Sequence, residues 1–417
     1  MIKTITSPSV ENNTHKSPKE LRDERFFASV QKYINIYMFF LPIMFVKIGG
    51  ISFTFFIFLI IIYKFLKNKK KLFRLSGLVD YLVILFFAIL ILSMIYGEET
   101  YRPYGEFADI KKGIQMIYWM MLALFLKTWA HKFNFYQIGK YLFYGLLVLV
   151  LGYFLLGAAS QNAFSFTMVL STPIALYYIM RRFSFLMLFF ISSSLFYFVF
   201  LSGSRTGAIV IMFQVLIYLL AAKLIRKKTL PLLISVFMLI AIITPIIYDT
   251  LKVEIASTIS PYNPDLAKLI ANTDKTLSED KSWLERKQYI IKGISIFKEH
   301  PLLGIGAGRF KYYWVNMEVI PELGKSLDFL NRHSPHNSYI QVLAGSGIIA
   351  LTIMLLLQYF VLKKSFKLLF AATRNYKLPI VLSFLGMSIY FYVIANAFGS
   401  ITWVVIGYGL SLLKERK

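Results

Sequence analysis

Long apolar runs separated by short polar segments make up most of this 417-residue chain. The runs are roughly 16 to 22 residues long, which is the length that an α-helix needs to cross the hydrocarbon core of a bilayer. They predict an all-α fold, a polytopic membrane protein with about twelve transmembrane helices. The expected spans lie at approximately 31–47, 49–66, 79–97, 113–129, 137–156, 161–180, 183–202, 206–224, 229–248, 338–362, 377–396 and 398–413.

The polar segments between these runs alternate in charge: one set is strongly basic, and the other is nearly neutral or acidic. Cytoplasmic loops are enriched in Lys and Arg, so the basic set and both termini are expected in the cytoplasm. Most of the formal net charge of +25 is therefore a topology signal. It predicts contact with anionic membrane lipids and no nucleic-acid partner. The basic segments are the N-terminal tail, 67–74, 127–132, 181–182, 226–228, 363–377 and 414–417.

This topology divides the chain into four parts. Residues 1–30 are polar and lack an apolar core, so we expect a disordered cytoplasmic tail and no signal peptide. Residues 31–248 hold the first nine spans, and residues 338–417 hold the last three with a short cytoplasmic tail. The long connection between them, 249–337, is expected on the periplasmic side. Long loops in compact proteins are usually functional, so this loop marks the expected working face.

The acidic side chains argue against a coupled transporter. They fall in the predicted loops and tails, except Asp80 at the cytoplasmic edge of a span. Ion-coupled transporters generally carry an ionisable group near the middle of the membrane. The chain has no cysteine, which also excludes disulfide and thiolate chemistry.

Arg205, in "FLSGSRTGAIVIM", stands at the outer end of a predicted span among serines and glycines. One interpretation is an arginine that anchors a helix end by reaching into the interface. The other is an anion receptor, because a guanidinium is always charged and binds phosphate oxygens in a bidentate way. An arginine at the outer membrane surface fits a lipid-linked phosphate.

Within the long loop, "SWLERKQYIIKGISIFKEHP" predicts an amphipathic helix over about 282–300. Ser282 and Glu285 have the spacing of a capping box, and Pro301 ends the helix. We expect the helix to lie against the membrane or to pack on the bundle. Arg286 near its start suits an anion held at the helix N-terminus, or a solvated arginine balanced by Glu285 or Asp280. The apolar residues at helical spacing are Leu284, Ile290, Ile291, Ile294 and Phe297.

The segment "PLLGIGAGRFKYYW" that follows does not fit a nucleotide-binding fingerprint. Arg309 interrupts its glycine pattern, and no strand–turn–helix context surrounds it. A turn that leads into aromatic residues suits a membrane-interface belt or sugar stacking better. The aromatic residues are Phe310, Tyr312, Tyr313 and Trp314.

His333 and His336 lie just before the tenth predicted span. The loop has no histidine cluster or acidic motif with recognised metal-ligand spacing, so no metal is expected. A single histidine titrates near neutral pH and can take a proton from a sugar hydroxyl. The alternative is a histidine that packs or caps at the helix start, where Pro335 and Asn337 suit a cap.

The segment "HNSYIQVLAGSGIIA" resembles the signature of the O-antigen ligase superfamily, with His336, Asn337 and Gly347 at the matching positions. Ala350 departs from the residues that the family often carries there. "SGSRTG" looks like the family's arginine at the outer end of a span, and "ERKQYIIKGISIFKEHPLLGIGAGRF" looks like its loop arginine segment. The twelve-span layout with one long periplasmic loop is also similar.

The resemblance implies a membrane-embedded inverting glycosyltransferase of GT-C type that needs neither metal nor cofactor. Such enzymes act on the periplasmic face of the inner membrane of Gram-negative bacteria. They move a glycan from undecaprenyl diphosphate to a sugar hydroxyl of lipid A–core. The resemblance implies that Arg205 and Arg286 bind the diphosphate and that His336 is the general base. Further expected substrate contacts are Asn337, Arg309, Arg332 and His333.

The superfamily also contains O-antigen polymerases and protein O-oligosaccharyltransferases, which use the same kind of donor. Polymerases tend to have two substantial periplasmic loops, whereas one loop dominates here. Protein-directed members usually carry further C-terminal sequence, whereas this chain ends soon after its last predicted span. A lipid-glycan transporter would line its spans with charge. We therefore expect a ligase first and a polymerase second.

Overall fold

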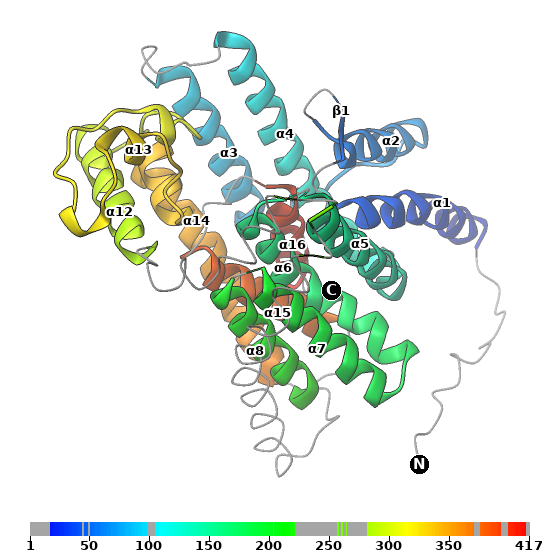
Figure 1. Cartoon of the computed structure of the whole chain (residues 1–417). Coiled ribbons are helices and arrows are strands. Elements are labelled where there is room, and N and C mark those ends of the chain that lie inside the picture. The colour runs from blue at the N-terminus through cyan, green and yellow to red at the C-terminus, as the bar shows by residue number, and fades with distance from the viewer. Residues whose placement is uncertain are drawn as a thin grey trace.

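The computed structural model describes residues 17–43, 46–48, 51–97, 105–157, 159–202, 204–221, 257, 260–261, 264, 282–370, 376–392 and 399–413 (Figure 1). These residues are helical apart from loops and one antiparallel hairpin, β1 (Lys47–Ile48) and β2 (Ile51–Ser52). The helices are α1 (Pro18–Phe40), α2 (Phe53–Lys67), α3 (Leu78–Tyr96), α4 (Gly105–Trp129), α5 (Phe135–Leu156), α6 (Gln161–Arg182), α7 (Phe185–Leu201), α8 (Arg205–Ala221), α12 (Ser282–Glu299), α13 (Leu327–Asn331), α14 (Ser338–Phe370), α15 (Lys377–Tyr390) and α16 (Ser400–Ser411). Short 3-10 turns add η2 (Ala130–Lys132), η4 (Phe310–Tyr312) and η5 (Pro321–Leu323).

The structure agrees with an all-α membrane protein. Among the described residues, four helices are long and apolar enough to cross a membrane: Leu78–Tyr96, Phe135–Leu156, Gln161–Arg182 and Ser338–Leu369. Shorter apolar helices are Phe190–Leu201, Thr206–Leu220, Lys377–Tyr390 and Ser400–Ser411. The predicted ninth span, 229–248, lies outside the described residues, so the number of spans stays a prediction.

The N-terminal part departs from the expected disordered tail. Helix α1 begins at Pro18, so the prediction of disorder is wrong for residues 18–30. A capping box starts the helix: the Ser17 hydroxyl accepts from the Glu20 amide at 3.3 Å, and the Ser17 amide donates to the Glu20 carboxylate at 2.9 Å. Phe26 and Val30 then bury their side chains in the bundle core. The start of this helix was not predicted because the surrounding residues are mostly polar.

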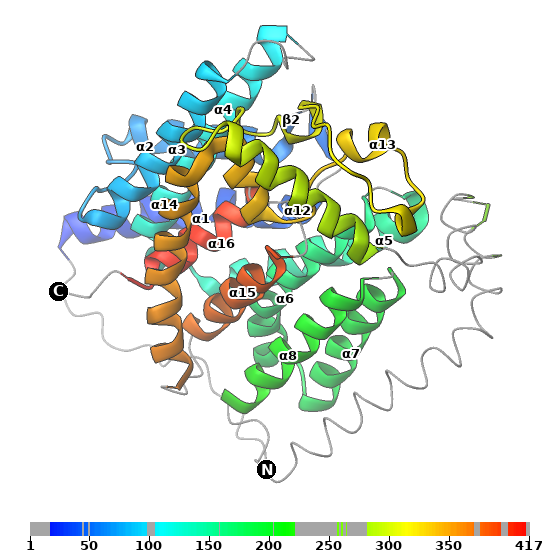
Figure 2. The same cartoon turned by 90° about the vertical axis from the view of Figure 1, so that its left-hand side faces the viewer.

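Helix α6 is the centre of the helical bundle, because almost its whole length is buried. It packs against α5, α7, α8 and α15 (Figure 2). Helix α16 packs against α4, and α14 packs against α3. Helix α14 also packs against the loop helix α12, so it links the loop to the bundle.

The loop 282–337 folds into a unit with its own small core, at one end of α14 (Figure 1). Helix α12 covers Ser282–Glu299, close to the expected 282–300, although the side chain of Ser282 is outside the described set. The sequence left open whether the apolar side chains of this helix face the membrane or the bundle. Ile290, Ile291 and Ile294 are exposed, whereas the buried face carries Gln288, Tyr289, Lys292 and Ile296.

This polar face is buried because backbone groups of the loop pair with it. The Gln288 side-chain amide donates to the Glu318 carbonyl at 2.8 Å and accepts from the Ile320 amide at 3.2 Å. A buried polar group is tolerated where such hydrogen bonds compensate the lost water. Helix α12 thus packs on the loop and on α14 and leaves Ile290, Ile291 and Ile294 exposed.

Candidate functional site

The turn after α12 is locked onto α14 by an interruption in that helix. Gly347 has φ +74°, outside the helical region, so hydrogen bonding within α14 is broken there. The freed groups pair with the turn: the Ile305 amide donates to the Ala344 carbonyl at 3.1 Å, and the Ile348 amide donates to the Pro301 carbonyl at 2.9 Å. A Cβ at Gly347 would lie 2.0 Å from the Leu302 carbonyl oxygen. The glycine of the His-Asn…Gly pattern is therefore required by this close approach.

The first residues of α14 are held just as firmly. The Asn337 side-chain oxygen caps the helix by accepting from the amides of Tyr339 and Ile340, at 2.9 and 3.0 Å. The Ser338 amide donates to the Phe391 carbonyl at 2.8 Å, which ties α14 to the end of α15. His336, one residue before the cap, has φ +46°. A residue with a Cβ is strained in this region, and such strain is kept where the surroundings impose it.

The surroundings of His336 keep its imidazole neutral near pH 7. Its ring lies 5.7 Å, centroid to centroid, from the fully buried ring of Tyr289 on α12. Burial lowers the pKa of His336 below the usual 6.5, and the positive charge of Arg286 lowers it further. The negative charge of Glu285 opposes this, and His333 adds to the lowering. A neutral imidazole can accept a proton, which is what a general base must do.

Arg286 connects this histidine to a second cluster. Its charge also acts on the hydroxyl of Tyr390, at the end of α15. That hydroxyl is 2.5 Å from the Ser165 hydroxyl on α6 and 2.8 Å from the Ser204 hydroxyl. Ser204 directly precedes Arg205, the first residue of α8. The Tyr390 hydroxyl is therefore in contact with Ser204, just before α8, and is influenced by the charge of Arg286 on α12.

Gly207 explains why small residues flank Arg205. A Cβ at Gly207 would lie 1.9 Å from the Ser165 hydroxyl and 2.9 Å from the Tyr390 hydroxyl. The first turn of α8 can approach this cluster only because that side chain is missing. The side chain of Arg205 is outside the described set, so its expected contact with an anion stays a prediction.

The remaining expected site residues lie in different surroundings. Arg309 is buried, and its guanidinium donates to the Met94 carbonyl at 2.9 Å and to the Ile305 carbonyl at 3.5 Å. It ties the loop to the end of α3, which is a structural role. Asn337 has the capping role described above, and its amide nitrogen also donates to the Tyr392 carbonyl at 3.3 Å.

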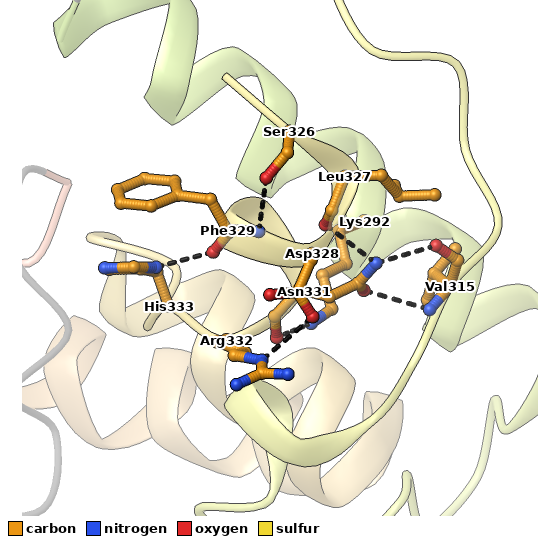
Figure 3. Close-up of polar contacts among 9 residues, drawn as sticks. All are labelled: Lys292, Val315, Ser326, Leu327, Asp328, Phe329, Asn331, Arg332 and His333. Carbon is orange, nitrogen blue, oxygen red and sulfur yellow. Dashed lines mark hydrogen bonds and ion pairs between the residues drawn. The ribbon is translucent and has the colours of Figure 1, made fainter.

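His333 and Arg332 lie around the end of α13 (Figure 3). The His333 ring stacks on Phe329 with centroids 3.9 Å apart, and its Nδ1 is 2.6 Å from the Phe329 carbonyl oxygen. Arg332 donates from Nε to Asp328 at 2.9 Å, and both side chains are exposed. The charges of Arg286 and His333 therefore both act on His336. Arg332 instead lines a separate pocket.

Sequence reasoning missed the buried residues Tyr289, Lys292 and Tyr390. Lys292 is fully buried and donates from Nζ to the Phe310 carbonyl at 2.9 Å and to the Asn331 carbonyl at 2.7 Å. Burial lowers its pKa from 10.5 to about 7. The only signal in the sequence was a lysine within an otherwise apolar helical stretch, "YIIKGISIF".

The described residues contain no group of three His, Cys, Asp or Glu side chains that could hold a metal ion. The described cluster combines a neutral histidine with the positive charge of Arg286 at the start of α12. Such a cluster suits an anion beside a group that accepts a proton.

Comparison with known proteins relates part of the chain to a known family. No curated protein matches this chain. Residues 187–355 match the family model described as O-antigen ligase, a range that contains Arg205, Arg286, His336 and Gly347. This match supports the resemblance found in the sequence and, with it, membership of the O-antigen ligase/polymerase family.

Proposed function

We propose that this protein is an O-antigen ligase of the bacterial inner membrane. It would transfer O-antigen glycan from undecaprenyl diphosphate to a sugar hydroxyl of lipid A–core, on the periplasmic face. The observation that carries this proposal is the partly buried, neutral His336 beside the charge of Arg286 at the start of α14. The match to the O-antigen ligase family supports the same reaction class.

The donor diphosphate would bind between Arg286 and Arg205. A guanidinium grips phosphate oxygens in a bidentate way, and the starts of α12 and α8 add the partial positive charge of helix N-termini. This proposal is supported by the Tyr390 hydroxyl, which contacts Ser204, the residue before Arg205, and on which the charge of Arg286 acts. The negative charge that develops on the departing diphosphate would be stabilised there.

His336 would act on the acceptor. Its imidazole takes the proton of the acceptor hydroxyl while that oxygen forms a bond to the anomeric carbon of the donor sugar. The bond from the anomeric carbon to the phosphate oxygen breaks, and undecaprenyl diphosphate leaves with the electron pair. Because the hydroxyl attacks opposite to the leaving group, the anomeric configuration inverts. The bound diphosphate places negative charge near His336, which raises the pKa of the imidazole and strengthens the base.

The strained backbone of His336 would serve to orient its imidazole. The cap at Asn337 and the bond from Ser338 to α15 fix where the ring points. Positioned reacting groups lower the barrier because orientation is achieved before the reaction. The alternative is a histidine that only packs at a helix start. In that case its removal should change the stability of the protein and leave glycan transfer intact.

A complementation experiment tests the ligase proposal. A strain that lacks its own ligase receives this gene and a matching glycan pathway, and its lipopolysaccharide is examined on a gel. The ligase proposal predicts a ladder with the wild type and no ladder with His336→Ala or Arg286→Ala at equal membrane levels. If glycan is attached without the gene and the gene only lengthens the chains, the protein is a polymerase. Full activity of His336→Ala would remove the proposed base.

A further inference from the structure

A cleft of about 470 Å³ opens on the loop unit, next to the segment that leads to His336. Its walls are two short stretches, Lys311–Trp314, which begins within η4, and the end of α13 with Asp328, Asn331 and Arg332. Its volume is in the range of pockets that hold small ligands. The cleft is separate from the cluster of Arg286, His336 and Tyr390, and the proposed transfer step does not use it.

The two walls are bound to each other through buried groups. The Asn331 side chain accepts from the Val315 amide at 3.0 Å and donates to the Val315 carbonyl at 3.1 Å (Figure 3). Lys292 binds both segments, through the carbonyl of Phe310, which precedes Lys311, and the carbonyl of Asn331. These contacts fix the spacing of the walls, so the cleft is part of the folded loop and needs no ligand to form it.

The surface of the cleft has the chemistry of a saccharide site. Trp314 is 49% exposed although its neighbours Tyr313 and Val315 are buried in the loop core. The exposed indole can stack on the apolar face of a sugar ring. Opposite it, Arg332 and Asp328 form an exposed ion pair that offers both donors and acceptors to sugar hydroxyls.

The charge of the lining narrows the ligand class. Lys311 and Arg332 carry positive charge and Asp328 carries negative charge, so the lining has an excess of positive charge. It therefore accepts a neutral or an acidic saccharide. A positive lining also argues against a cationic peptide as the occupant.

The cleft also lies along the chain that carries the proposed base. Arg332 in the wall is followed by His333, which stacks on Phe329 of α13, and three residues later by His336. A saccharide that enters the cleft would thus be held by the same segment that orients His336. This arrangement suits a sugar that is part of the substrate but does not react.

We propose that the Lys311–Trp314 and Asp328–Arg332 cleft is a saccharide-binding subsite that holds a non-reacting sugar of one substrate. The proposal rests on the proposed glycosyl transfer. The sugar belongs either to the donor glycan or to the core oligosaccharide of the acceptor, since both present pyranose rings with hydroxyl or acidic groups.

Binding to the purified full-length protein in detergent tests this subsite directly. The probes are the glycan freed from undecaprenyl diphosphate and the core oligosaccharide freed from lipid A, each titrated by calorimetry. We expect one of them to bind, and Trp314→Ala to weaken its Kd by about tenfold or more. Trp314→Phe keeps an aromatic ring and should retain most of the affinity. The probe that binds identifies the source of the sugar.

Controls separate this proposal from the catalytic one. His336→Ala should bind the saccharide like the wild type, so binding persists even if the proposed base is wrong. Leu302→Ala removes another exposed apolar side chain of the loop, 62% exposed, and should not change binding. The subsite is refuted if neither probe binds, or if Leu302→Ala weakens binding as much as Trp314→Ala, which indicates a membrane anchor.

A kinetic measurement gives a second readout. In transfer assays, Trp314→Ala should raise the KM of the substrate that supplies the sugar and leave kcat within about twofold, because the subsite binds ground state and transition state alike. A fall in kcat with unchanged KM would contradict a binding subsite.

Discussion

His333 and His336 are three residues apart, yet the structure gives them opposite surroundings. His333 is stacked on Phe329, and its Nδ1 lies 2.6 Å from a backbone carbonyl. His336 sits in a strained backbone conformation, and no described residue hydrogen-bonds to its ring. Its neighbours are a buried tyrosine and the charge of Arg286. The chemistry of a histidine is thus set by what its ring faces, and the spacing of the pair says little about it.

The same contrast separates the two loop arginines. Arg309 is buried with its guanidinium on backbone carbonyls, so it stabilises the loop. Arg286 is half-buried, and its charge acts on His336 and on Tyr390. A charged group whose partners are backbone carbonyls stabilises structure, whereas one that faces titratable groups can serve a reaction.

The largest expected effect comes from the two histidines themselves. His336→Ala should lower kcat/KM by about 10²- to 10⁴-fold, because a general base is lost. His333→Ala should keep transfer within a few-fold of the wild type. Both are measured with purified protein, a lipid-linked donor and equal folded amounts. A similar loss of kcat/KM in both variants would contradict the different roles of the two histidines and indicate a shared structural role.

The two arginines should differ next. Arg286→Gln should lower kcat by about 10²-fold, since one group that stabilises the leaving diphosphate is gone. Arg309→Gln should lower the folded yield and the melting temperature instead, with kcat per folded enzyme nearly unchanged. Transfer assays and thermal unfolding of the same preparations separate the two effects. Loss of kcat in well-folded Arg309→Gln would contradict the structural role.

Lys292 joins the loop to the segment before the histidines, and its removal should cost stability. Lys292→Ala leaves the carbonyls of Phe310 and Asn331 without their partner, at about 1–3 kcal/mol. The native pKa of about 7 lies below the unfolded value of 10.5, so the unfolded chain binds more protons between these values. The stability of the wild type should therefore rise with pH from about 7 to 10.5 relative to the variant.

Thermal unfolding at pH 7 and pH 9 measures this difference. Lys298→Ala, an exposed lysine on the same helix, is the matched control and should follow the wild type. Equal pH dependence in wild type and Lys292→Ala would show that Lys292 keeps an ordinary pKa.

The smallest effect is expected for the stacking of His333. His333→Ala should lower stability by about 0.5–1.5 kcal/mol, which is the value of an aromatic pair. His333→Phe keeps a ring on Phe329 and should recover most of it. If His333→Phe loses as much stability as His333→Ala, the contact with the Phe329 carbonyl and not the stacking stabilises this site.

Hydrophobic pattern predicted the helical character well, because a run long enough to cross a membrane is visible in the sequence itself. Helix α1 was missed at its start, where a capping box outweighed a polar composition. The buried face of α12 was also missed. Gln288 and Lys292 are buried because distant carbonyls receive their hydrogens, and such partners cannot be read from helical spacing.

Sequence reasoning found His336 and Arg286 through a motif, and their proximity is consistent with the expected site. Tyr289 and Tyr390 were not predicted as site residues, because the sequence does not distinguish an aromatic residue that packs in the core from one that faces a site. The Trp314 cleft escaped as well. It exists only where two loop segments are joined by the contact of Asn331 with Val315, 16 positions away in the sequence.

The central claim is that His336 is the base, and the pH dependence of kcat/KM tests it most directly. For kcat/KM of the donor, which reports the enzyme before the diphosphate binds, we expect an acidic limb below pH 6.5 in the wild type, because the imidazole becomes protonated and inactive there. Glu285 raises the pKa of His336, so Glu285→Gln should move the limb to lower pH. Lys325→Met removes the ion-pair partner of Glu285 but leaves the negative charge of Glu285 in place, so it should not move the limb to lower pH. A limb that Glu285→Gln leaves in place, or no acidic limb at all, would contradict the account.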